Sequence, residues 1–169
     1  MRTLLLMRHA KAERGDGKAD HERALSSRGQ REAQQVGRWI AAQELGPLHV
    51  LCSSSLRTRE TLAALQVAGA LDRAAIEVEE GLYLASASAM LERLRAVPAE
   101  VPAVCVIGHN PGTHELAVAL AGEGDREAYE RLRDRMPTSA LAWLELDDEP
   151  AGAHTSRGSG RSWEQLAPG

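Results

Sequence analysis

The chain has 169 residues, a length that fits one domain with its own hydrophobic core. Apolar residues make up 43% of it and charged residues 26%, which excludes a disordered or fibrous protein. The formal net charge of -4 gives no long-range attraction for nucleic acid or for an anionic membrane, so we expect neither as a partner. Any affinity for phosphate must therefore come from a local site.

The N-terminal segment and the two cysteines carry no functional signal. Met1 and Arg2 precede an apolar run of about five residues, which is too short for a signal-peptide core or a membrane span. We therefore expect a cytoplasmic protein. Cys52 and Cys105 stand singly inside apolar stretches, so we interpret both as buried thiols.

The first half of the chain alternates short apolar runs with segments of helical periodicity. The first apolar run ends abruptly at Arg8-His9, as a buried strand does where it passes into a loop. Ser27 and Gln30 form a capping-box pattern that predicts the start of a helix, and Gly46-Pro47 separates that helix from the next apolar run. We expect strands over 3–7 and 48–52, and helices over 28–44 and 56–68.

The second half repeats this alternation. Ser86 or Ser88 can cap a helix that Pro98 ends, and Asn110-Pro111 has the pattern of an N-cap followed by the first helical residue. The run over 103–107 is the most apolar in the sequence. We expect strands over 76–78, 103–107 and 140–146, and helices over 86–97, 111–122 and 125–135.

Strands that alternate with helices predict an α/β fold. Because each crossover carries a helix, we expect a three-layer α/β/α arrangement with a mostly parallel central sheet. Residues 147–160 turn acidic and then rich in Gly and Ser, which predicts a mobile loop, and 162–166 are a candidate edge strand. We therefore interpret 1–169 as a single domain.

Three segments bring basic side chains to the carboxyl ends of predicted strands. Arg8 and His9 follow the first strand, Arg57 follows the second, and His109 follows the apolar run over 103–107. In open α/β sheets ligands bind at this edge, and the helix N-termini beside Arg57 and His109 favour an anion. Each residue alone has a purely structural interpretation. Their joint placement predicts a site for a dianionic phosphoryl group.

Four motifs in the first 120 residues resemble those of the histidine phosphatase superfamily, also called phosphoglycerate-mutase-like. Arg8-His9-Ala10 resembles its R-H-[GA] signature, and Gly108-His109 resembles its second-histidine motif. The other two matches are Ser53 to Leu62, for S-x-x-x-R-A-x-x-T-[AL], and Leu25 to Ala33, for L-[ST]-x-x-G-x-x-x-A. Arg23-Ala24-Leu25, Asn110-Pro111 and Thr138-Ser139-Ala140 are similar to the SixA-like phosphohistidine phosphatase branch.

The resemblance implies a reaction and a set of roles. His9 would attack phosphorus and form a phosphohistidine enzyme that water then hydrolyses, with Arg8, Arg57 and His109 holding the phosphoryl oxygens. Arg23 would add a fourth contact. The family is metal-independent, so no cofactor is expected. The partner would be a phosphorylated substrate, with a phosphohistidine-bearing protein as a candidate.

One departure from the family pattern bears on the substrate. Many relatives that cleave phosphate esters carry an acid after the third strand in an L-x-E pattern, where this chain has Leu82-Tyr83-Leu84. Phosphohistidine needs less help to leave, so the missing acid favours N–P substrates. Two alternatives stay open: an ester phosphatase that uses Glu80 as its proton donor, and a phosphate-binding domain without catalysis.

Overall fold

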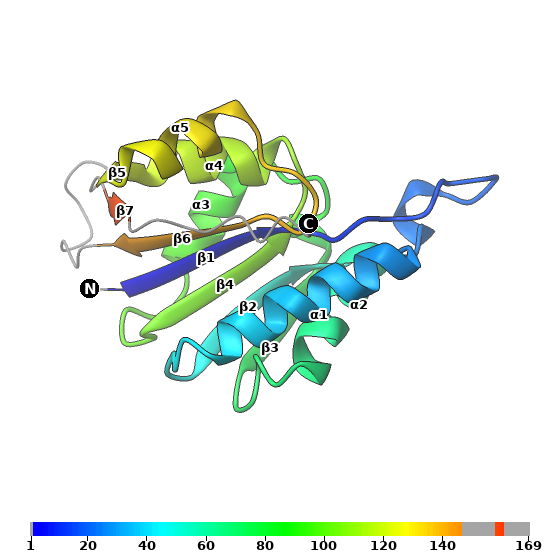
Figure 1. Ribbon diagram of the computed structural model, residues 1–169, viewed down its shortest axis with the longest axis horizontal. Helices are drawn as coiled ribbons and strands as arrows, with labels where there is room; N and C mark the ends of the chain where they lie inside the picture. Colours follow the sequence, from blue (N-terminus) through cyan, green and yellow to red (C-terminus); the bar gives the residue numbers. More distant parts are fainter. Residues whose placement is uncertain (1, 147–157, 161–169) are drawn as a thin grey trace.

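The computed structural model describes residues 2–146 and 158–160, and its centre is a sheet with the strand order β3-β2-β4-β1-β6-β7-β5 (Figure 1). β1 pairs in parallel with β4, β4 with β2, and β2 with β3, whereas β6 lies antiparallel to β1. The strands are β1 (Arg2–Arg8), β2 (Leu48–Ser53), β3 (Ala75–Glu79), β4 (Ala103–Gly108), β5 (Ala121–Gly124), β6 (Leu141–Leu146) and β7 (Gly158–Gly160). The expected α/β fold with a mostly parallel sheet is confirmed.

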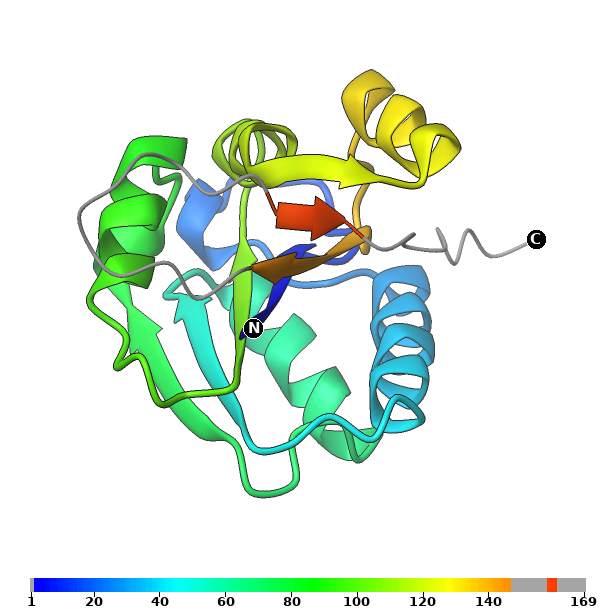
Figure 2. The same ribbon diagram turned by 90° about the vertical axis from the view of Figure 1, so that its left-hand side faces the viewer.

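Helices cover both faces of the sheet (Figures 1 and 2). Leu5 and Met7 of β1 face a core shared with one pair of helices, and Leu4 and Leu6 face the core of the other three. Because β1 is buried on both faces, its sequence is a continuous apolar run. The helices are α1 (Ser27–Ala41) and α2 (Leu56–Val67) on one face, and α3 (Ala87–Arg95), α4 (Gly112–Leu120) and α5 (Arg126–Asp134) on the other. Cys52 and Cys105 are buried and unpaired, as expected.

Two predicted helix starts are wrong by a residue. The hydroxyl of Ser26, not Ser27, accepts a hydrogen bond from the first turn of α1. α4 begins at Gly112, after the cis peptide bond between Asn110 and Pro111, and the Asn110 amide donates to the carbonyl of Met136 instead of capping the helix. The cap of α3 at Ser86 is confirmed.

Several short elements were not predicted, because their sequences have no helical or strand periodicity. They are the one-turn 3₁₀ helices η1 (Asp20–Glu22) and η2 (Glu80–Leu82), together with β5 and β7. Of the loop predicted over 147–160, the structure describes only 158–160, which pair with β5 and β6 as β7. Residues 147–157 and the candidate strand over 162–166 lie outside the described residues. Within the described ranges, no helix is long and apolar enough to cross a membrane.

Candidate active site

A cleft of about 250 Å³ opens at the carboxyl edge of the sheet, where β1, β2 and β4 end. Strand register explains the meeting of these segments, since Arg8 lies opposite Gly108 and Cys52 lies opposite Ile107. The cleft is lined by Arg8, His9, Lys11, Ala12, Arg23, Arg57, Leu84, His109, Asn110 and Thr138. Five of the six predicted site residues therefore come together, and Glu80 does not line the cleft.

His9 is held as a neutral imidazole with one nitrogen available. Its side chain is buried, and its Nδ1 lies 2.8 Å from the carbonyl of Ala10, so Nδ1 carries the proton and donates it. Burial, together with the charges of Arg57, Arg8 and Arg23, lowers the pKa of His9 to about 4. Nε2 therefore keeps its lone pair at neutral pH and accepts from Arg57 Nε at 3.3 Å.

Arg57 presents its guanidinium to both histidines of the site. It is the second residue of α2 and is 3% exposed. The edge formed by Nε and Nη2 donates to His9 Nε2 and to His109 Nδ1, each at 3.3 Å. The edge formed by Nη1 and Nη2 donates to the backbone carbonyl and the carboxylate of Asp20 at 2.7 and 3.0 Å. The two edges thus have separate partners.

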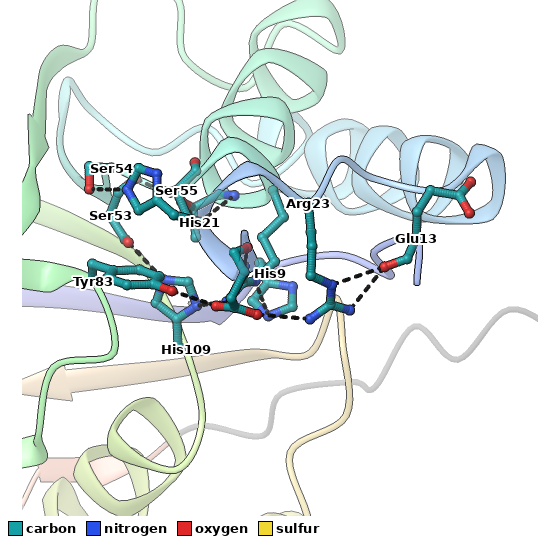
Figure 3. Close-up of polar contacts among 12 residues, drawn as sticks. His9, Glu13, His21, Arg23, Ser53, Ser54, Ser55, Tyr83 and His109 are labelled. Carbon is teal, nitrogen blue, oxygen red and sulfur yellow. Dashed lines mark hydrogen bonds and ion pairs between the residues drawn. The ribbon is translucent and has the colours of Figure 1, made fainter. Parts of the chain in front are cut away.

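His109 completes the pair of imidazoles. Its ring centroid lies 5.3 Å from that of His9 (Figure 3). Because Nδ1 accepts from Arg57, Nε2 carries the proton and donates to Ser53 Oγ at 2.7 Å. Burial and the charge of Arg57 lower the pKa of His109 to about 3, so its ring is neutral at neutral pH. A bound dianion would raise this pKa, since it stabilises the protonated ring.

Arg8 and Arg23 add two further guanidinium groups. Arg8 donates through Nη1 to the carbonyl of Met136, while its buried Nε has no partner among the described residues. Burial and Arg57 lower the pKa of Arg8 below its ordinary value. Arg23 donates twice to the carbonyl of Glu13 (Figure 3). It also donates once to Asp20 Oδ1. A phosphoryl group in the cleft would meet planar donors on several sides.

Buried hydrogen bonds fix the backbone on which His9 stands. The hydroxyl of Thr61 accepts from the amide of Ala10 and donates to the carbonyl of Arg57, which locks the end of β1 to the start of α2. On the other side the amide of Ser139 donates to the carbonyl of His9. The Ser139 hydroxyl donates in turn to Glu32, a buried carboxylate of α1. The backbone of the nucleophile candidate is therefore held by α2 and by the segment before β6, which in turn is bonded to α1.

Glu80 lies outside the cleft. Its side chain is exposed in η2, and Leu84 is the residue from this segment that lines the cleft. Glu79, its neighbour, is paired with Arg93. The geometry therefore gives the proton-donor role of Glu80 no support.

Asp20, Tyr83 and Ser53 belong to the site but were not predicted from the sequence. Asp20 contacts two arginines, and Tyr83 donates to its carboxylate. Both residues lie in irregular segments that give no periodic signal. Ser53 offered a weak signal, because it directly follows the strand predicted over 48–52, at the edge where the histidines meet.

Comparison with known proteins places the chain in a family. A model of the histidine phosphatase superfamily (branch 1) matches residues 4–139. The chain belongs to the histidine phosphatase superfamily. Among its relatives is an uncharacterised protein of Mycobacterium tuberculosis, 38% identical over 142 residues, which cover 83% of this chain and 87% of that protein.

Solved structures of this superfamily include similar chains of the SixA type. One, described as a candidate phosphohistidine phosphatase SixA from Agrobacterium tumefaciens, has 31% identity and a TM-score of 0.74, with 85% of this chain and 91% of that chain covered. Another, the protein histidine phosphatase SixA complexed with tungstate, has 28% identity and a TM-score of 0.70 and covers 86% and 89%. The resemblance to the SixA-like branch is confirmed.

Proposed function

We propose that the chain is a phosphohistidine phosphatase in which His9 accepts the phosphoryl group. The observation that carries this proposal is the state of His9, a neutral ring whose Nε2 faces the cleft beside Arg57 while the Ala10 carbonyl holds the other nitrogen. A neutral nitrogen with a fixed lone pair is a competent nucleophile. Membership of the superfamily and similarity to SixA structures, one of them complexed with the oxyanion tungstate, support it.

The reaction proceeds in two displacements at phosphorus. His9 Nε2 attacks in line and forms an N–P bond as the bond to the leaving group breaks, and the leaving group departs with the proton it carries. Water then attacks the same phosphorus, breaks the bond to Nε2 and releases inorganic phosphate. Arg8, Arg57, Arg23 and His109 stabilise charge on the equatorial oxygens in both steps, so positioned donors supply most of the catalysis.

The lining of the cleft favours substrates with an N–P bond. None of the described residues that line it is Asp or Glu. Leu84, two residues after η2, lines the cleft and is 56% exposed. Asp20 lies nearby, but a hydrogen bond from Tyr83 and the neighbouring arginines hold its pKa well below the usual range, so it stays ionised. An alkoxide would leave without a proton donor, whereas the imidazole of phosphohistidine can leave already protonated. The exposed rim also suits a phosphohistidine displayed on a protein.

A substrate panel tests this proposal. We would measure kcat/KM for phosphoramidate, a phosphohistidine peptide, an aryl phosphate and a sugar phosphate. Because a positioned acid contributes about 100- to 10,000-fold, the N–P substrates should exceed the sugar phosphate by about that range, with the aryl phosphate between them. Glu80→Gln should leave all rates unchanged. If the sugar phosphate is the best substrate and Glu80→Gln removes that activity, the ester-phosphatase alternative replaces this proposal.

A further inference from the structure

Asp20 sits at the junction of three side chains of the site. Its carboxylate accepts from Arg57 Nη2 at 3.0 Å, from Arg23 Nη1 at 3.1 Å and from the hydroxyl of Tyr83. Its backbone carbonyl accepts a further bond from Arg57 Nη1 at 2.7 Å. Arg23 and Tyr83, which bind this carboxylate, lie on opposite sides of the site (Figure 3). Asp20, which lies in a polar loop, is therefore hydrogen-bonded to both Arg23 and Arg57.

The contacts of Asp20 leave the reactive edge of Arg57 free. A guanidinium has two edges that can each donate a pair of parallel bonds, one formed by Nη1 and Nη2 and the other by Nε and Nη2. Asp20 occupies the first edge, so the second points to His9 Nε2 and His109 Nδ1, where a phosphoryl group would lie. Without Asp20, the guanidinium would have no partner on its first edge and could rotate about its side chain. The two bonds to Asp20 prevent this rotation and so fix the direction of the second edge.

The pairing also sets the charge of this part of the site. Arg8, Arg23 and Arg57 line the cleft together, and the first and last lie close enough for Arg57 to lower the pKa of Arg8. Asp20 compensates part of this charge from the outer side, because its two ion pairs are with Arg57 and Arg23. The side chain of Asp20 is 46% exposed, so its carboxylate stays in contact with water while it binds a buried arginine. That arrangement orients Arg57 without placing a second anion between the two histidines.

We propose that Asp20 is a positioning residue that orients Arg57 and joins Arg23 to the phosphoryl clamp. The proposal rests on the proposed function, since orientation of Arg57 matters for turnover only if a phosphoryl group binds against its second edge. Asp20 does not contact the reacting atoms. It acts through Arg57, and misplacement of a donor by about 1 Å can cost on the order of 100-fold in rate.

A double-mutant cycle distinguishes positioning from a general structural role. Asp20→Ala should lower kcat/KM for phosphoramidate by about 10- to 100-fold in the wild type. In a chain that already carries Arg57→Ala the same change should cause a markedly smaller loss, because only the contact with Arg23 remains to be broken. Equal losses in both backgrounds would overturn the proposal, since they would show that Asp20 acts independently of Arg57.

The matched control is Glu22→Gln. Glu22 belongs to the same one-turn helix, is exposed, and has no side-chain hydrogen bond or ion pair within the described part of the chain. Glu22→Gln removes one negative charge, as Asp20→Ala does. If Asp20 acts by orienting Arg57 and not through net charge, Glu22→Gln should leave kcat/KM unchanged. A loss as large as that of Asp20→Ala would contradict the proposal. If Asp20→Ala lowers the melting temperature, the cycle is run with Asp20→Asn, which keeps the shape of the side chain.

Tungstate binding separates this inference from the phosphatase proposal. The dissociation constant for tungstate is measured by calorimetry across the same cycle, which requires no turnover. The change caused by Asp20→Ala should differ on the order of 10-fold between chains with and without Arg57→Ala. Absence of turnover on every substrate would refute the proposed function and leave this coupling as the test of Asp20. Identical changes in both backgrounds would refute the role of Asp20 itself.

Discussion

Replacing Arg57 by alanine removes a guanidinium that contacts both imidazoles of the site. The side chain is almost fully buried and donates to His9, His109 and Asp20. The edge formed by Nε and Nη2 would supply two N–H donors to a phosphoryl group. Loss of one preorganised donor of this kind costs about 3 to 4 kcal/mol of transition-state stabilisation, so we expect kcat to fall by at least about 100- to 1,000-fold.

The same substitution should change the pH dependence. Burial is the main cause of the low pKa values of His9 and His109, and the positive charge of Arg57 lowers both further. Removing that charge raises both values toward the ordinary one. Because the nucleophile must be neutral, the acid limb of kcat/KM should move from near pH 4 in the wild type to higher pH in the variant.

Arg59→Ala is the matched control for this prediction. Arg59 lies two residues further along α2, where its exposed side chain donates to the carbonyl of Ser54. Steady-state kinetics with phosphoramidate between pH 4 and pH 9 would compare the two variants, with melting temperatures as the folding control. Equal losses for Arg57→Ala and Arg59→Ala would refute the placement of Arg57 against the phosphoryl group.

Two further predictions concern stability. His9 and His109 have folded pKa values below that of an unfolded histidine, so between about pH 6.5 and pH 4 the unfolded state binds more protons and the free energy of unfolding falls as the pH falls. Each histidine should contribute a loss of about 2 kcal/mol between pH 6.5 and pH 5, which urea titrations can measure; an unchanged pH dependence in His9→Asn would contradict this. Thr61→Val keeps the side-chain shape but leaves the buried amide of Ala10 without its acceptor, so it should lower the free energy of unfolding by about 1 to 3 kcal/mol and also reduce kcat. Wild-type stability in that variant would show that the bond between β1 and α2 is not what holds His9.

Much of the fold follows from the periodicity of the sequence. The runs that become β1 and β4 are continuous because helices bury both faces of the sheet. The alternation of such runs with helices predicted the mostly parallel sheet. The clustering of Arg8, His9, Arg57 and His109 followed from a general property of such sheets, that segments after parallel strands meet at one edge. The glycine of the L-[ST]-x-x-G-x-x-x-A motif, Gly29, also has a structural reason: α1 passes so close to the backbone of Lys11 that a Cβ at this position would clash with the Lys11 carbonyl.

What the sequence could not predict depends on irregular backbone. Asp20 reaches Arg57 only because the loop after His9 folds back and forms η1, and no pattern within that loop encodes the return. Glu80 was a reasonable candidate by its position near the end of a strand. η2 turns the chain so that Leu84, with a φ of 50°, faces the cleft instead. Side-chain direction in such segments is set by contacts between distant residues and not by local propensity.

The central claim, that His9 carries the phosphoryl group, is tested most directly by trapping the phosphoenzyme. Wild-type protein is mixed with phosphoramidate, quenched in alkali, digested, and analysed by mass spectrometry for a phosphoryl group that is stable to base and labile to acid. The account predicts that this group lies on the peptide containing His9, and that His9→Ala gives neither phosphoenzyme nor turnover while its fold stays intact. Normal turnover in His9→Ala, or a phosphoryl group trapped on another residue of the wild type, would contradict it.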